Sequence, residues 1–119
     1  MSHPIVHIEL SANNHEEAAK FYTAVFDWQI QSFPEMNYTT FTSGEGGPGG
    51  GFNNVSDEYP AGQVVIYINT DNIEASMEKV EANGGQRVSP DIDIPGVGTM
   101  AMFKDPTGNT LSLLKPAEM

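Results

Sequence analysis

Cysteine is absent from this chain of 119 residues. Disulfides and thiolate zinc sites are therefore excluded, and the redox compartment cannot be inferred. Basic residues are scarce, because 5 Lys and Arg stand against 16 Asp and Glu, which gives a formal charge of −11. Nucleic acids and anionic membranes are bound through basic patches, so we expect neither as a partner. This negative charge favours a neutral or cationic small molecule as the binding partner.

Long apolar runs are also missing. No stretch approaches the roughly 18 apolar residues of a membrane-spanning helix. The opening residues, MSHP, lack the charged and apolar regions of a signal peptide, so we expect a cytoplasmic protein. The length suits one compact domain over residues 1–119, with enough apolar residues for one core.

The chain contains an internal repeat. Residues 5–10 alternate between an apolar face and a mixed face that carries Ile5, His7 and Glu9. Residues 13–14 offer an N-cap, and apolar residues then recur at helical spacing as far as residue 26. The same pattern returns without a gap at residues 63–72, and a second amphipathic helix follows it.

Strand-like segments complete both halves. They lie at residues 28–33, 38–42 and, less regularly, 50–54, and again at residues 86–89, 98–103 and 110–114. Between the last two segments, residues 105–108 (DPTG) have the composition of a tight turn. We predict an α+β fold of two pseudo-symmetric βαβββ modules, about 3–56 and about 62–116. They would form a curved mixed sheet around a cleft, with the helices on the outer face.

The alternation of side chains predicts which residues line this cleft. Those on the face opposite the helices are His7, Glu9, Val65, Tyr67, Asn69 and Ser112. Met100 and Met102 share one face of their strand and could floor an adaptable pocket or pack in the core. His7 and Glu9 are the candidates for acid-base chemistry, because imidazole titrates near neutral pH and the two share a face. Either could equally be a hydrogen-bonded or solvated residue.

Other residues suggest less. Residues 44–51 are glycine-rich, but no Lys-Ser/Thr pair follows, so a flexible hairpin loop is favoured over a phosphate-binding loop. His15 should be solvated in the first turn of its helix. Phe21, Tyr22 and Trp28 should belong to the core.

In combination, these segments resemble the vicinal oxygen chelate superfamily, which includes glyoxalases, bleomycin-resistance proteins and extradiol dioxygenases. The likeness is carried by residues 5–10 (IVHIEL), 18–28 (AAKFYTAVFDW), 93–98 (DIPGVG) and 103–113 (FKDPTGNTLSL). It is greatest to the glyoxalase-like proteins of this superfamily. The resemblance implies the paired-module fold and, from small members, a homodimer.

In metal-dependent members, the resemblance implies one His, Glu or Gln ligand from the first and the last strand of each half. His7 is the one position retained. The resemblance implies a carboxylate from the last strand of the first half, near residues 50–52, but no Asp, Glu or His occurs from residue 46 to residue 56. Val65 and Ser112 occupy the other two positions. A single imidazole cannot hold a divalent ion, so we predict no metal and no other cofactor, with a divalent metal as the alternative.

Three functional hypotheses remain. The first is a glyoxalase-like or bleomycin-resistance-like protein that binds a small neutral or cationic molecule in the cleft without a metal. The second is an enzyme of the lyase or dioxygenase type, metal-dependent or metal-free, with His7 and Glu9 in catalysis. The third is a structural or regulatory dimer with a vestigial cleft.

Overall fold

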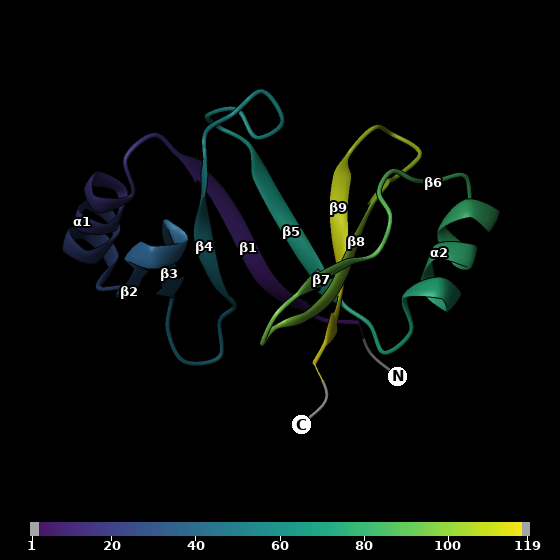
Figure 1. Cartoon of the computed structure of the whole chain (residues 1–119), viewed down its shortest axis with the longest axis horizontal. Coiled ribbons are helices and arrows are strands. Elements are labelled where there is room, and N and C mark those ends of the chain that lie inside the picture. The colour runs from purple at the N-terminus through teal and green to yellow at the C-terminus, as the bar shows by residue number, and fades with distance from the viewer. Residues whose placement is uncertain (1–2, 118–119) are drawn as a thin grey trace. The chain divides into compact units, whose positions relative to one another are not determined.

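The computed structural model describes residues 3–117, so both ends of the predicted 1–119 domain lie outside the described residues. The chain divides into two compact units. The N-terminal unit comprises residues 7–65, and the described part of the C-terminal unit comprises residues 3–6 and 66–117. Figure 1 labels the elements of both. The predicted module limits remain predictions.

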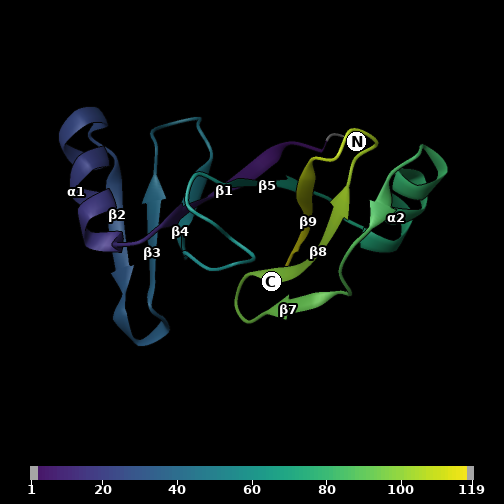
Figure 2. The same ribbon diagram turned by 90° about the horizontal axis from the view of Figure 1, so that it is seen from above.

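The N-terminal unit is a four-stranded mixed sheet with one helix. Its strands lie in the order β2-β3-β4-β1, with β1 parallel to β4 and the other pairs antiparallel. Helix α1 lies along β2 in Figures 1 and 2. The elements are β1 (Ile5–Ala12, from His7 in this unit), α1 (His15–Phe26), β2 (Gln29–Phe33), the 3-10 turn η1 (Pro34–Met36), β3 (Tyr38–Thr42) and β4 (Gly49–Asn54).

The C-terminal unit repeats this plan. Strands β5, β9, β8 and β6 are neighbours in that order, β5 is parallel to β9, and β7 pairs with β8. Helix α2 packs beside β6 and β8 (Figure 2). The elements are β5 (Val64–Asn69, from Ile66 in this unit), α2 (Ile73–Ala82), β6 (Gln86–Arg87), β7 (Ile92–Ile94), β8 (Gly98–Lys104) and β9 (Thr110–Pro116).

These elements confirm the predicted α+β class and the repeated order of strand, helix and strands. Strand β7 is an addition that the sequence pattern did not predict. Its three residues pair antiparallel with the start of β8, from Ile92 opposite Met100 to Ile94 opposite Gly98. A run of this length is too short to show an alternating pattern, so only its pairing partner defines it.

The two helices begin in the same way, as the repeat predicts. The side chain of Asn14 accepts a hydrogen bond from the Glu17 amide, and that of Asn72 accepts one from the Ala75 amide, each at 2.9 Å. Both caps have extended backbone angles and satisfy an amide of the first helical turn. The N-cap predicted at residues 13–14 is therefore confirmed at Asn14, and Asn72 is its counterpart in the repeat.

Stacked aromatic rings form the core of the N-terminal unit. Trp28 stacks between Tyr22 on α1 and Phe41 on β3, with ring centroids 4.6 Å and 4.5 Å apart. Phe41 lies against Phe52 of β4, and both are almost completely buried. The prediction that Phe21 belongs to the core was wrong, because its side chain is 55% exposed. Phe21 meets Tyr22 edge-on from the outside while Tyr22 covers the sheet.

The core of the C-terminal unit is aliphatic by contrast. Ile73 and Met77 of α2 pack against Phe103 and Leu113 on the sheet, with Ala101 fully buried among them. Burying each large apolar side chain contributes about 1.5–3 kcal/mol to folding. The predicted amphipathic character of this helix is confirmed, because its apolar residues Ile73 and Met77 face β8 and β9. No helix in the described residues is long and apolar enough to cross a membrane.

The turn between β8 and β9 is fixed by one carboxylate, as its composition predicts. Asp105 accepts hydrogen bonds from the amides of Thr107 and Asn109 and from both of their side chains. Gly108 takes the left-handed angle, with φ 96°. These bonds hold the pKa of Asp105 at about 2, below its ordinary 3.8, with the Asn109 side-chain bond as the largest cause.

We expect Asp105→Ala to lower the melting temperature at pH 7 and the deficit to shrink as the pH falls from about 4 towards 2. The folded-state pKa is depressed, so this stabilisation is present above the unfolded pKa and is lost as the folded carboxylate protonates. Thermal unfolding followed by circular dichroism at pH 7, 4 and 2 measures it. Glu45→Ala, which removes an exposed loop carboxylate, is the control. A deficit that is constant with pH would contradict the prediction.

Candidate functional site

His7 and Glu9 come together, as their shared strand face predicts. Both lie on β1, and the Nε2 atom of His7 is hydrogen-bonded to the Oε2 atom of Glu9. The two differ in burial, because the side chain of His7 is 28% exposed and that of Glu9 only 4%. The hydrogen bond to the buried Glu9 carboxylate orients the His7 ring.

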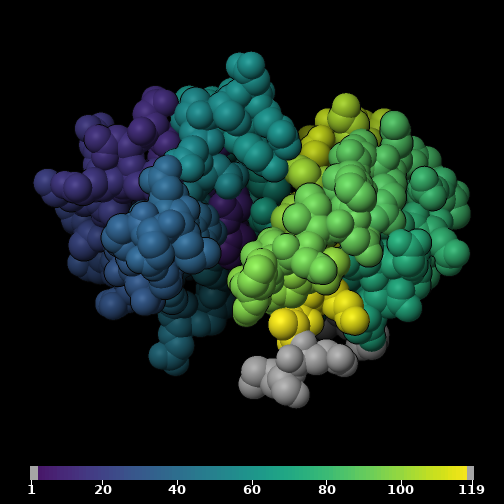
Figure 3. All heavy atoms as spheres, in the orientation of Figure 1, coloured from purple at the N-terminus to yellow at the C-terminus, as the bar shows by residue number. Residues whose placement is uncertain are grey.

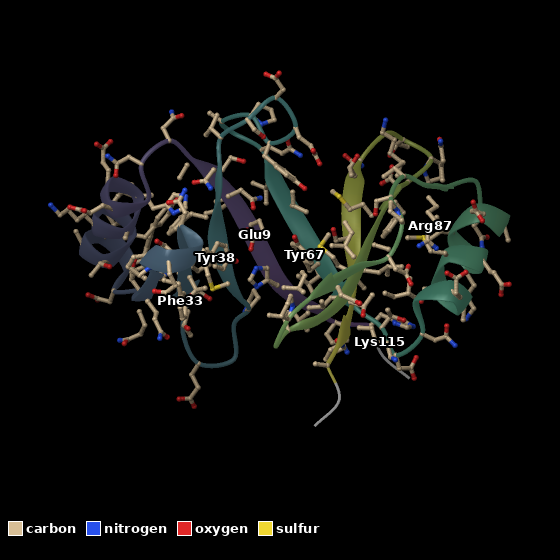
Figure 4. All side chains as sticks on the ribbon, viewed as in Figure 1. Glu9, Phe33, Tyr38, Tyr67, Arg87 and Lys115 are labelled. Carbon is tan, nitrogen blue, oxygen red and sulfur yellow. The ribbon has the colours of Figure 1, made fainter. Side chains whose placement is uncertain are left out.

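Tyr38 is the third member of this group, which sequence reasoning missed. Its hydroxyl donates a hydrogen bond to Oε2 of Glu9 at 2.5 Å and lies 3.3 Å from Nε2 of His7. Figure 4 labels Glu9 and Tyr38, which reach each other from β1 and β3. We call His7, Glu9 and Tyr38 the carboxylate cluster. Two donors on one oxygen compensate a charge that burial would otherwise destabilise by several kcal/mol.

Tyr38 can reach Glu9 because Gly51, on the strand between them, has no side chain. Strand β4 lies between β1 and β3, with Gly51 opposite Glu9 on one side and Thr40 on the other. A Cβ atom at Gly51 would lie 2.0 Å from the Tyr38 hydroxyl oxygen. The phenol therefore crosses β4 directly over the glycine. The glycine-rich segment, which the sequence suggested is a flexible loop, is a strand from Gly49 onward.

Tyr59 adds a second phenol to the electrostatics of the cluster. It lies in the segment between β4 and β5, which projects from the surface of the N-terminal unit in Figure 3. Burial is the largest cause that raises the pKa of Tyr59, and the carboxylates of Glu58 and Glu9 raise it further. Tyr59 thus stays protonated and feels the negative charge of Glu9.

The predicted residues of the C-terminal unit also share one sheet face. Tyr67 of β5 is opposite Ser112 of β9, which is opposite Met102 of β8. The Tyr67 hydroxyl lies 4.0 Å from the sulfur of Met100. Tyr67, Ser112, Met100 and Met102 therefore form a second group. Among the remaining predicted residues, Asn69 binds Pro4 through its backbone and Val65 is buried in β5.

Ser112 has an unusual environment within the C-terminal unit. The residue is completely buried, and its hydroxyl has no hydrogen-bond partner among the described residues. A buried hydroxyl without a partner loses its hydration without compensation. Ser112 therefore fills space between Tyr67 and Met102 and supplies no anchoring hydrogen bond.

His15 differs from the expectation of a solvated side chain. It is half-buried with its ring centroid 6.1 Å from that of Phe52, and its Nε2 atom is buried without a partner in the described part of the chain. The cap at Asn14 starts the helix so that its first residue faces the sheet. The expectation of a solvated His15 was wrong because a residue in the first turn can lie on the side of the helix that faces the sheet.

The donor set does not fit the divalent metal that the family resemblance implies. His7 is bound to Glu9, and the first-half carboxylate position on β4 is glycine, covered by Tyr38. The other two positions are Val65, which is apolar, and Ser112, whose hydroxyl is enclosed. No group of three or more His, Cys, Asp or Glu in residues 3–117 is placed to hold a metal ion. Structural and catalytic sites need three or four such donors.

Comparisons with known proteins give one family. The model of the Glyoxalase/Bleomycin resistance protein/Dioxygenase superfamily matches residues 4–113. A glyoxylase-like domain-containing protein of Didymella fabae is 36% identical over 110 residues, which cover 87% of this chain and 86% of that protein.

Two further similarities are more distant. The anthracycline biosynthesis protein DnrV of Streptomyces peucetius is 29% identical over 125 residues, and the match covers 86% of this chain but only 43% of DnrV. The crystal structure of a hypothetical protein, BH1468 from Bacillus halodurans C-125, has a TM-score of 0.75. That match covers 100% of this chain and 98% of the other at 16% identity, so it concerns the fold alone.

We expect Ser112→Ala to leave the free energy of unfolding unchanged or to raise it by about 1 kcal/mol, because it removes a buried hydroxyl that has no partner. Urea denaturation measures this change. Thr70→Val is the matched control, because the equally buried Thr70 hydroxyl bonds Ser76 and the Asn72 amide. It should lower stability by about 1–3 kcal/mol. Loss of stability in Ser112→Ala would indicate a partner for the hydroxyl.

Proposed function

Because the chain belongs to the glyoxalase/bleomycin resistance protein/dioxygenase superfamily, we propose that it binds a small organic cation at the carboxylate cluster, without a catalytic metal. The observation that carries the proposal is the pairing of Glu9 with His7 and Tyr38 in place of a ring of metal ligands. The cluster places negative charge beneath an accessible imidazole. A positively charged guest is the complement of this arrangement.

The surroundings of the cluster support an amine attached to an aromatic or apolar body. Tyr38 presents its phenol ring beside Glu9, and a cation is attracted to the face of such a ring. The charge of −11 on the chain adds a long-range attraction for cations. Among the relatives, a protein named for anthracycline biosynthesis agrees with a polycyclic aromatic guest.

A metal-free enzyme is the second candidate, and one observation favours it. An accessible His7 oriented by the buried Glu9 is the arrangement of a general base and its partner. This candidate, the homodimer and the cytoplasmic location remain predictions. The binding proposal is preferred because it requires only the charge and the contacts of the cluster.

We expect benzylamine, which is cationic at pH 7, to bind at least tenfold more tightly than neutral benzyl alcohol, about 1.4 kcal/mol in binding free energy. Glu9→Gln should remove most of this preference, since it deletes the charge and keeps the size. Isothermal titration at low and at 0.5 M salt measures the affinities, and salt should weaken benzylamine alone.

Glu78→Gln is the control for this comparison. It removes one exposed carboxylate from α2 and so changes the net charge equally. Benzylamine binding that is equal to benzyl alcohol binding, or that Glu78→Gln weakens as much as Glu9→Gln does, would contradict the proposal. Circular dichroism spectra should confirm that both variants are folded.

We also expect Ni²⁺ or Zn²⁺ to leave the melting temperature unchanged and a chelator to leave benzylamine affinity unchanged. A ligand that binds only the folded state raises the melting temperature, so a metal site would be visible in this measurement. The second measurement is elemental analysis for bound metal. It uses protein that carries no histidine tag and was purified without chelator. Near-stoichiometric nickel, zinc, iron or manganese that the His7→Ala variant loses would contradict the metal-free proposal.

A further inference from the structure

We propose that Tyr38 occupies the place of the metal ligand missing from the N-terminal unit, and that Gly51 exists at its position to admit this phenol. Tyr38 is then a positioning residue, because it acts on a guest through Glu9. The inference deepens the proposed function, and its binding test rests on that function. Its structural test does not.

The strand register gives the first argument. Glu9 on β1 and Thr40 on β3 are both opposite Gly51, so a side chain at residue 51 would project from the sheet face that carries Glu9, between Glu9 and Thr40. The family resemblance implies a carboxylate ligand on this part of β4. The space above Gly51 is therefore the position of the absent ligand.

The phenol of Tyr38 fills this space. The three heavy atoms nearest to a Cβ built at Gly51 all belong to Tyr38, at 2.0 Å, 2.4 Å and 2.8 Å. Real Cβ atoms do not approach other heavy atoms this closely, so residue 51 can carry a side chain only if Tyr38 moves away. A carboxylate on β4 and the present position of Tyr38 exclude each other.

The exchange changes the chemistry of the cluster. A carboxylate at residue 51 would add a second acceptor beside Glu9, and two acceptors with an imidazole suit a divalent ion. The Tyr38 hydroxyl donates to Oε2 of Glu9 and holds that carboxylate in one orientation. One negative charge in a fixed position suits a singly charged organic guest.

Gly50 is the control for Gly51, because a side chain at Gly50 would lie on the opposite face of the sheet. A Cβ there would lie 2.0 Å from the backbone oxygen of Ile8 and 2.3 Å from the ring of Phe41. Tyr38 is not among these contacts. Removing Tyr38 therefore cannot relieve a side chain at Gly50.

The structural test is a double-mutant cycle followed by thermal unfolding. Gly51→Ala should lower the melting temperature by about 4 °C or more in the otherwise unchanged protein, because the new methyl group collides with Tyr38. In the Tyr38→Ala protein the same change should be neutral or raise the melting temperature, since alanine restricts the unfolded chain. Gly50→Ala should lower it in both. An equal loss from Gly51→Ala in both backgrounds would overturn the proposal.

The positioning role is tested by Tyr38→Phe, which keeps the ring and removes the hydroxyl. The ratio of benzyl alcohol to benzylamine dissociation constants should fall by about threefold or more, because Glu9 loses a donor that orients it. A merely structural phenol would weaken both compounds equally, and that result would overturn the role. If the unchanged protein shows no preference for benzylamine, the proposed function fails while the thermal cycle still decides the Tyr38 and Gly51 arrangement.

A gain of metal binding is the third expectation. Gly51→Glu combined with Tyr38→Ala places a carboxylate in the emptied space beside His7 and Glu9. This protein should bind Ni²⁺ at least tenfold more tightly than Tyr38→Ala alone, by isothermal titration of folded, untagged protein. Equal Ni²⁺ affinity in the two folded variants would show that the space over Gly51 is not a ligand position.

Discussion

The buried charge of Glu9 is the constraint from which the site follows. A carboxylate that is 4% exposed must find donors inside the protein, and two of them meet on its Oε2 atom. His7 reaches it along the same strand, but Tyr38 must cross an intervening strand. That crossing requires a residue without a side chain, so the burial of one charge accounts for Gly51.

The fold and two of the three members of the carboxylate cluster could be predicted from the sequence. The alternation of residues 5–10 brings His7 and Glu9 to one face, and the DPTG turn sets the register that places Ser112 opposite Met102. Tyr38 could not be found in this way. Its contact depends on the order β3-β4-β1, in which two strands distant in the chain pair in parallel. Local patterns do not encode such non-sequential neighbours.

The glycine-rich segment, residues 44–51, shows the same limit of prediction from local sequence. Composition alone suggests flexibility for residues 44–51, and the first part of the run does lie between strands. Gly50 and Gly51 are buried in β4, where each admits an aromatic ring over the backbone. A glycine that provides conformational freedom and one that admits a neighbouring ring look identical in a sequence. Only the neighbours, here Phe41 and Tyr38, distinguish them.

Strand β4 thereby links the core of the N-terminal unit to its site. Phe41 lies over Gly50 on the helix side, where it joins the stack with Trp28, and Tyr38 lies over Gly51 on the opposite side. Both rings come from β3, so a shift of β3 relative to β4 would move the aromatic core and the donor to Glu9 together. Packing density makes such a shift unfavourable. The donor to the buried carboxylate and the aromatic core are consequently positioned by the same strand pairing.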